Sequence, residues 1–204
     1  YDVEIIDYLF YKHKSHKTTK LSKPWINIGF ERKVKELLYP IIYSLKTLFK
    51  RKQQQLLRYK FESFHKKNTS FSKVQYPSMN ELYTAHLNYD IFIVGSDQVW
   101  NPWSNTSLDP YFLTFAPKGK KRISYASSFG VAELPLQATD KYKNRLNDLD
   151  SISVRESSGL EIVQKLTGRM AEHVVDPTML LTRSEWEQIA VKPPINEPYI
   201  LLYN

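Results

Sequence analysis

The chain has 204 residues, a length that suits one domain or one and a half. It contains no cysteine, which excludes disulfides, thiolate nucleophiles and cysteine metal sites and fits a cytoplasmic location. The five histidines are scattered without the spacing of metal ligands, so we expect no bound metal.

The net charge of +8 is distributed unevenly along the chain. Residues 1–90 hold 17 Lys and Arg against 8 Asp and Glu, a balance of +9, whereas residues 91–204 hold 12 against 13, a balance of −1. A basic segment favours an anionic partner, such as a nucleic acid, a membrane surface or a phosphorylated substrate. The alternative is a solvated face on a helical insertion. We expect no nucleic-acid partner, because the chain carries no recognisable nucleic-acid motif.

The first part of the chain combines one strand with basic helices. Val3–Ile6 reads as a strand, and a later helix carries Leu57, Phe61 and Phe64 on one face with cationic residues around it. The pattern predicts a basic helical hairpin over residues 30–66. Such a hairpin either packs on its own domain or lies on an anionic membrane, here at the inner face.

From residue 78 onward, predicted helices and strands alternate. The helices are Ser78–His86, Asp140–Asp148, Ser158–Leu166 and Thr182–Ala190, and the strands are Ile91–Val94, Arg122–Ala126, Ile152–Val154 and His173–Val175. Two helices open with capping-box pairs, which are Ser78 with Glu81 and Ser158 with Glu161, and Thr182 and Glu185 start the last helix. The alternation predicts an α/β fold, a Rossmann-like parallel sheet with helices on both faces.

Prolines mark a linker near the end of the sequence, and Tyr199–Leu202 begins a further strand. We therefore expect an incomplete N-terminal domain over residues 1–192. Residues 193–204 would then form a linker and the first strand of a second domain.

Polar side chains follow the ends of four predicted strands. They lie at Gly95–Gln98, Ser127–Ser128, Arg155–Glu156 and Asp176–Thr178. Because ligands bind beyond the carboxyl ends of parallel strands, we expect these groups to converge on one edge of the sheet. The alternative for the first group is a tight turn in which a buried Asp97 caps backbone amides.

Four short motifs occur in a fixed order along the chain, and the ordered set is more specific than any one motif. They are YDIFIVGSDQVWNP (89–102), ISYASSFG (123–130), ISVRE (152–156) followed by Ser158-Gly159, and VDPTMLL (175–181). Together they resemble the polysaccharide pyruvyl transferase family, over about residues 76–190. The opening residues 1–8 also look like the second strand of that family.

The resemblance implies the N-terminal half of a two-domain, glycosyltransferase-B-like bacterial enzyme. It would move a pyruvyl group from phosphoenolpyruvate to two hydroxyls of a sugar, forming a ketal in a cell-surface or exopolysaccharide precursor. The partners implied are phosphoenolpyruvate, which is a donor substrate rather than a cofactor, and a glycan acceptor. The basic segment beside an apolar stripe adds the hypothesis of a lipid-linked sugar acceptor. The family also places a catalytic His in the second half, so we expect this segment to be inactive alone.

Arg155 and Asp97 are the candidate catalytic residues. The planar Arg155 guanidinium can pair bidentately with the carboxylate or phosphate of the donor. Its alternative role is a structural ion pair with Glu156 or Asp176. Asp97 would hydrogen-bond sugar hydroxyls or act as a general base for one of them, and its alternative role is a buried turn residue.

The candidate substrate-binding residues surround these two in sequence. They are Gly95, Ser96, Gln98, Trp100, Asn101, Ser127, Ser128, Glu156 and Asp176. Trp100 or Trp103 would offer an apolar face to a sugar, and the alternative for Trp100 is a place in the core. Two other functions are compatible with the sequence: a glycosyltransferase with a nucleotide-sugar donor, and a non-enzymatic basic binding module.

Overall fold

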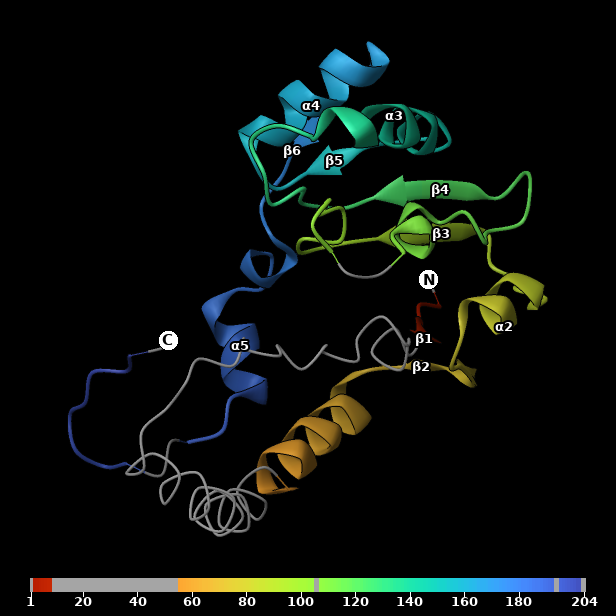
Figure 1. Cartoon of the computed structure of the whole chain (residues 1–204). Coiled ribbons are helices and arrows are strands. Elements are labelled where there is room, and N and C mark those ends of the chain that lie inside the picture. The colour runs from red at the N-terminus through yellow and green to blue at the C-terminus, as the bar shows by residue number, and fades with distance from the viewer. Residues whose placement is uncertain (1, 9–54, 105–106, 193–194, 203–204) are drawn as a thin grey trace, which may run out of the picture. The chain divides into compact units, whose positions relative to one another are not determined.

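A computed structural model describes residues 2–8, 55–104, 107–192 and 195–202. The chain divides into two compact units, unit 1 (Tyr1–Thr84) and unit 2 (Ala85–Asn204), coloured from red to yellow and from yellow to blue in Figure 1. Most of the predicted hairpin, residues 30–54, lies outside the described residues. The expected domain limits at 1–192 and 193–204 stay a prediction.

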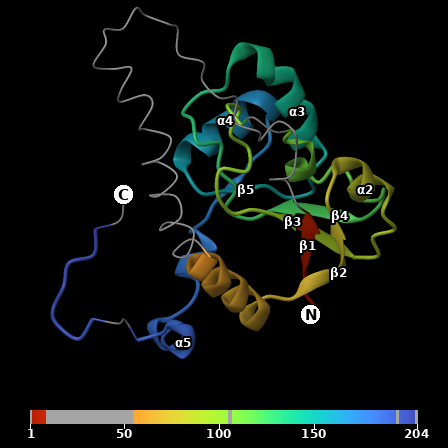
Figure 2. The same cartoon turned by 60° about the horizontal axis from the view of Figure 1, so that its bottom comes forward.

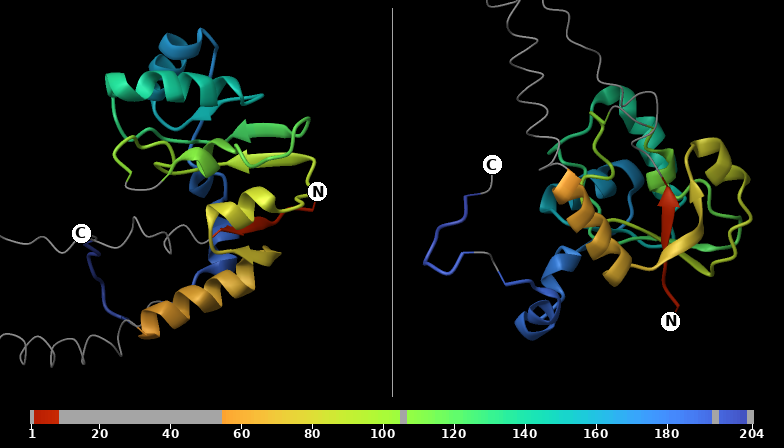
Figure 3. Two further views of the ribbon diagram at one scale, coloured as in Figure 1. Left: turned by 45° about the vertical axis from the view of Figure 1, so that its right-hand side comes forward. Right: turned by 90° about the horizontal axis from the view of Figure 1, so that it is seen from below.

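Unit 1 contains a pair of parallel strands, β1 (Ile5–Tyr8) and β2 (Phe71–Tyr76), which lie side by side (Figure 3). Side chains reinforce the pairing, since Gln75 Nε2 donates to Asp7 Oδ2 at 2.7 Å and the Asp7 amide donates to Ser72 Oγ at 2.9 Å. The first strand begins two residues later than predicted, and the sequence pattern did not reveal the second strand.

Among the described residues of unit 1, two helices accompany these strands, one over residues 55–68 and α2 (Met79–Thr84). At the start of α2, the Glu81 amide donates to Ser78 Oγ at 3.3 Å, and the Ser78 hydroxyl donates to the Glu81 carboxylate at 2.9 Å. The predicted start at Ser78 is therefore confirmed, and the helix ends at Thr84 rather than His86.

Unit 2 contains two further parallel pairs, β3 (Ile91–Val94) with β4 (Lys121–Ser124), and β5 (Ser153–Val154) with β6 (Glu172–His173). Parallel bridges between Ile123 and Ser151 and between Ser127 and Val154 join β4 to β5. The strands thus follow one another in chain order (Figure 1). The fold is mixed α/β with small parallel sheets, and the Rossmann-like sheet with helices on both faces stays a prediction.

Buried serines strengthen the junction of β4 and β5. The Ser153 amide donates to Ser124 Oγ at 3.0 Å, the Ser124 hydroxyl donates to the Ser153 carbonyl at 3.0 Å, and the Ser153 hydroxyl donates to the Ser124 carbonyl at 2.8 Å. Because both side chains are buried, each hydroxyl needs a partner, and the two strands supply it.

Three helices complete unit 2: α3 (Thr139–Asn147), α4 (Ser157–Thr167) and α5 (Arg183–Ile189). Helices α3 and α4 pack against each other (Figure 2). The 3₁₀ turns η3 (Asp109–Phe112), η4 (Leu136–Ala138) and η5 (Pro177–Met179) lie in the connections.

The helix limits test the capping patterns. The predicted helix start at Thr182 and Glu185 is confirmed, and in the structure these two residues form a capping box at the start of α5. The prediction for Ser158 and Glu161 was wrong, because the backbone of Glu156 is extended (φ −126°, ψ 150°) and the helix already starts at the next residue. Gly168 ends this helix with φ 70°, as expected for a helix-terminating glycine.

An aromatic cluster fills the core of unit 2. Trp100, Phe112 and Phe129 are fully buried, and the Trp100 and Phe112 rings stack at 5.2 Å with an interplanar angle of 2°. The Tyr142 hydroxyl donates to the Trp100 carbonyl at 2.8 Å, which links the cluster to α3. Burial in this cluster raises the pKa of Tyr142.

The C-terminal segment differs from expectation. Residues 199–202 form no strand, because a strand needs a hydrogen-bonded neighbour and none of the described strands pairs with them. Among the helices that the structure describes, none has the length and apolar character needed to span a membrane.

Candidate functional site

The polar segments after the strands of unit 2 converge on one edge. Parallel bridges join Asp97 to Ser127 and Ser127 to Val154, so the ends of β3, β4 and β5 lie in register. Side chains extend the convergence to the end of β6, where Asp176 meets Arg155. The predicted meeting of strand ends is confirmed, whereas the chemical roles assigned to the residues stay predictions.

Arg155 stands at the centre of this edge, between two carboxylates. Its Nη1 lies 3.1 Å from Asp176 Oδ2, and its Nη2 lies 3.3 Å from Asp97 Oδ1. The two partners differ in exposure, since the Asp97 side chain is 81% exposed and the Asp176 side chain 22%. The ion pair with Asp176, foreseen as the structural alternative for Arg155, is therefore present, with Asp97 as a second partner.

Asp176 is held as an anion. The Thr178 amide and hydroxyl donate to Asp176 Oδ1 at 3.0 and 2.8 Å, and these bonds, followed by those from Arg155 and the Ser96 hydroxyl, keep the pKa of Asp176 far below its usual range. Reciprocally, the hydrogen bond that Arg155 donates to the Asp176 carboxylate is the main cause that raises the pKa of Arg155. The guanidinium is consequently a fixed cation with one tightly held carboxylate.

Asp97 adopts the left-handed backbone conformation, with φ 68°, which Asp tolerates better than most residues. Its carbonyl, rather than its carboxylate, accepts the amides of Val99 at 2.8 Å and Ser128 at 2.9 Å. The alternative of a buried, amide-capping Asp97 side chain is thus wrong. The carboxylate points out from the edge, where a ligand could reach it.

Gly95 permits the close approach of β3 to the segment after β4. Its φ is +122°, and a side chain at this position would collide with the Tyr125 carbonyl oxygen. The same segment is held by the Tyr125 amide, which donates to the Val94 carbonyl at 2.9 Å. Gly95 therefore shapes the edge through its backbone.

Gln98 and Asn101 form a polar pair beside Gly130. Asn101 Nδ2 donates to Gln98 Oε1 at 2.9 Å, and Asn101 Oδ1 accepts the Trp103 amide at 2.9 Å. A side chain at Gly130 would come within 2.7 Å of the Gln98 amide group and 2.8 Å of the Asn101 amide nitrogen. The structure thus brings together two predicted binding residues and shows why a glycine faces them.

The side chains of several predicted binding residues form hydrogen bonds with backbone groups of the protein. Ser127 is fully buried and donates to the Val94 carbonyl at 3.3 Å. The buried Ser128 accepts the Gly130 amide at 3.0 Å, and Glu156 Oε1 accepts the Phe129 amide at 2.9 Å. These contacts shape the loop after β4.

Trp100 does not offer a face to a ligand. Its side chain is 0% exposed, and its Nε1 donates to the Tyr111 carbonyl at 2.8 Å. The structure shows the core position foreseen as the alternative for Trp100, because its ring packs against those of Phe112 and Phe129. Trp103, by contrast, is 67% exposed.

His173 was missed by sequence reasoning. Its Nε2 lies 2.9 Å from the Arg155 carbonyl oxygen, so the last residue of β6 bonds to the backbone of the central arginine. No motif signalled this contact, because it depends on the pairing of β5 with β6. Thr178 was seen only as a turn residue, although both of its donors hold Asp176.

The edge combines an arginine, two carboxylates and amide side chains. Such a set can bind an anion, orient hydroxyls and accept a proton. Within the described part of the chain, no group of His, Asp or Glu residues is arranged to hold a metal ion.

The family model of polysaccharide pyruvyl transferase matches residues 1–204. The curated proteins and the solved structures gave no match to this chain.

Proposed function

Because the chain belongs to the polysaccharide pyruvyl transferase family, we propose that it transfers a pyruvyl group from phosphoenolpyruvate to a sugar of a cell-surface or exopolysaccharide precursor. In this proposal, unit 2 is part of a Rossmann-like half of a glycosyltransferase-B-like enzyme. The observation that supports it best is the position of Arg155 between Asp97 and Asp176 at the edge where the strands end.

The reaction consumes one phosphoenolpyruvate and two sugar hydroxyls. The methylene carbon of the donor gains a proton, its neighbouring carbon forms bonds to both sugar oxygens, and the bond from that carbon to the phosphate oxygen breaks. One hydroxyl proton balances the new methyl group, and the other leaves with the phosphate. The enzyme therefore has to hold two anionic groups of the donor and to move protons.

Arg155 is the residue proposed to hold an anionic group of the donor. Its guanidinium has five N–H donors, and the hydrogen bonds to Asp97 and Asp176 involve one at each terminal nitrogen. A donor carboxylate or phosphate would displace the exposed Asp97 rather than Asp176, which two bonds from Thr178 hold in place. The guanidinium would then pair with the substrate while keeping its position.

Asp97, once displaced, is the proposed general base for an acceptor hydroxyl. Its carboxylate is exposed and lies on the same edge as Ser96, Gln98 and Asn101, whose polar side chains suit sugar hydroxyls. One arginine would thus couple donor binding to release of the base. Gln98 and Asn101 would exchange their mutual hydrogen bond for bonds to the sugar.

The proposal is tested by incubating the full-length protein with isotopically labelled phosphoenolpyruvate and candidate glycan acceptors. Transfer of label to the glycan, together with release of phosphate, is the expected result. Arg155→Lys should lower turnover at least about 100-fold, because lysine cannot reproduce a bidentate contact. The matched control is Arg183→Lys, at a side chain that is 92% exposed and pairs with Glu187 on α5.

Three outcomes would overturn the proposal. They are transfer from a nucleotide sugar in place of phosphoenolpyruvate, near-normal turnover of Arg155→Lys, and equal losses in the Arg155 and Arg183 variants. The first would favour a glycosyltransferase of the same fold. The last two would mean that Arg155 has only a structural role.

A further inference from the structure

The helix over residues 55–68 exposes a row of large apolar side chains, which is unfavourable on a surface that faces water. Every residue of this helix is exposed. Leu57, Phe61 and Phe64 recur at the spacing of one helical face, and they are 51%, 66% and 45% exposed. The fourteen described residues of this helix, at about 1.5 Å each, span roughly 21 Å, long enough to lie along a surface.

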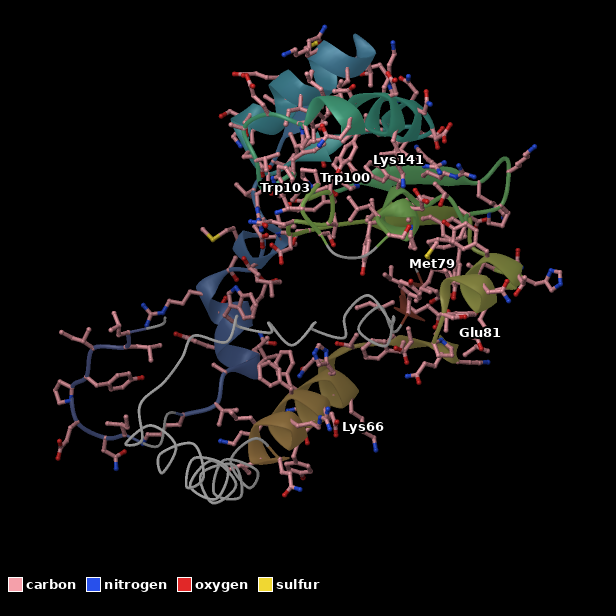
Figure 4. The ribbon with its side chains drawn as sticks, viewed as in Figure 1. Lys66, Met79, Glu81, Trp100, Trp103 and Lys141 are labelled. Atoms are coloured by element: carbon pink, nitrogen blue, oxygen red, sulfur yellow. The ribbon has the colours of Figure 1, made fainter. Side chains whose placement is uncertain are left out.

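Cationic residues border this apolar row. At 3.6 residues per turn, Lys60 and Lys67 follow one border of the row and Arg58 follows the other. The same helical spacing puts Lys66, whose side chain is labelled in Figure 4, on the opposite face. Over residues 55–68, four cations stand against the single carboxylate of Glu62, a balance of +3. Long cationic side chains at the borders can keep their charges in water while the apolar row is buried.

We propose that this helix lies in the interface of an anionic membrane, with its apolar row toward the acyl chains and its bordering cations at the headgroups. The combination favours a lipid surface over a nucleic acid, because a phosphodiester backbone matches the charges but offers nothing to three exposed apolar side chains. The inference does not depend on the transferase activity. It assigns a binding partner to this helix, which has no role in the candidate site at the strand ends of unit 2.

The first experiment uses the absence of cysteine from the chain. A Phe61→Cys variant carrying an environment-sensitive fluorophore should show a blue shift with vesicles of phosphatidylcholine and phosphatidylglycerol, and little shift with phosphatidylcholine alone. The matched control is Met170→Cys, at a residue of unit 2 that is 85% exposed. Absence of a shift at residue 61, or equal shifts at both positions, would overturn the proposal.

The second experiment measures the contribution of the bordering cations by vesicle flotation at low salt. Each cation near an anionic surface contributes about fivefold to partitioning, so Lys60→Gln with Lys67→Gln should weaken it roughly 25-fold. The control pair Lys143→Gln with Lys165→Gln changes the net charge equally at exposed sites on α3 and α4.

The two pairs of variants separate a specific surface from general attraction of a basic protein. Equal losses in both pairs would overturn the proposal, because binding would then follow net charge alone. Binding to a duplex oligonucleotide without binding to anionic vesicles would also overturn it and would make the helix a nucleic-acid surface. Loss of vesicle binding on adding salt is expected, since the headgroup attraction is screened.

Discussion

Arg155 donates to Asp97 across a separation of 58 residues in the chain, with Nη2 3.3 Å from Oδ1. The bond joins the segment after β5 to the segment after β3, and a second bond at 3.1 Å joins Arg155 to Asp176 after β6. One guanidinium therefore connects three strand ends. Of the two carboxylates, Asp97 is the exposed one. Asp176 is therefore suited to holding the guanidinium in place, and Asp97 is suited to contact with a substrate.

We predict that Asp97→Asn lowers turnover by about 10²- to 10⁴-fold, since the amide cannot accept a proton from an acceptor hydroxyl. The free energy of unfolding should change by less than about 0.5 kcal/mol, because the lost ion pair is exposed and Asn tolerates left-handed backbone. Turnover of phosphoenolpyruvate and urea unfolding are the two measurements. Wild-type turnover in this variant would contradict the role of Asp97 as a base.

Trp100 and Trp103 should respond in opposite ways to truncation. Trp100→Ala removes a fully buried indole from the aromatic cluster and should destabilise the protein by about 3–5 kcal/mol. Trp103→Ala, at a side chain that is 67% exposed, should cost less than about 0.5 kcal/mol. Urea unfolding of the two variants checks this, and equal stability would mean that Trp100 is not a core residue.

Gly95→Ala should lower the free energy of unfolding by more than about 3 kcal/mol, because the added methyl group would collide with the backbone carbonyl of Tyr125, which is fixed in position. The matched control is Gly119→Ala. Gly119 also has a positive φ, +81°, but nothing lies within 4 Å of the added carbon, so only the backbone strain of about 1 kcal/mol is expected. Similar unfolding free energies for the two variants would contradict the close approach at Gly95.

Elements with local signals were predictable from the sequence. The strand Ile91–Val94 was predicted with its observed limits, and α3 lies within one residue of its expected range. The strand β2 was not predictable, because its pairing depends on residues far away, as the bond between Asp7 and Ser72 across 65 residues shows. Helix α4 starts earlier than expected, because Glu156 has an extended backbone and is the N-cap, so the first helical residue is Ser157.

The position of the candidate site was more predictable than the use of its side chains. Alternating strands and helices place strand ends on one edge, so the meeting of Asp97, Arg155 and Asp176 followed from topology. Whether a side chain faces a ligand or the interior depends on packing. Trp100 is buried because η3 and α3 enclose it, and Glu156 is occupied because the loop after β4 presents the Phe129 amide.

Asp109 joins η3 to α3 through two cations, and its contribution to stability should depend on pH. Asp109 Oδ1 lies 3.1 Å from Lys141 Nζ and 3.2 Å from Arg145 Nε. Partial burial acts to raise the pKa of Asp109, but the hydrogen bonds and charges of Lys141 and Arg145 outweigh it and lower the pKa below its usual value. The folded state therefore binds the proton of Asp109 less readily than the unfolded state does.

A carboxylate with a lowered folded-state pKa stabilises the fold above its unfolded pKa of about 4, and this stability is lost as the pH falls through the folded value. Asp109→Asn should thus lower the free energy of unfolding by about 1 kcal/mol at pH 7. The difference from the unchanged protein should stay constant down to about pH 5 and shrink below about pH 4. Urea unfolding over this range measures it, with Glu187→Gln on α5 as the exposed control. A difference that stays constant below pH 4 would show that the pair at Asp109 carries no titration-linked stability.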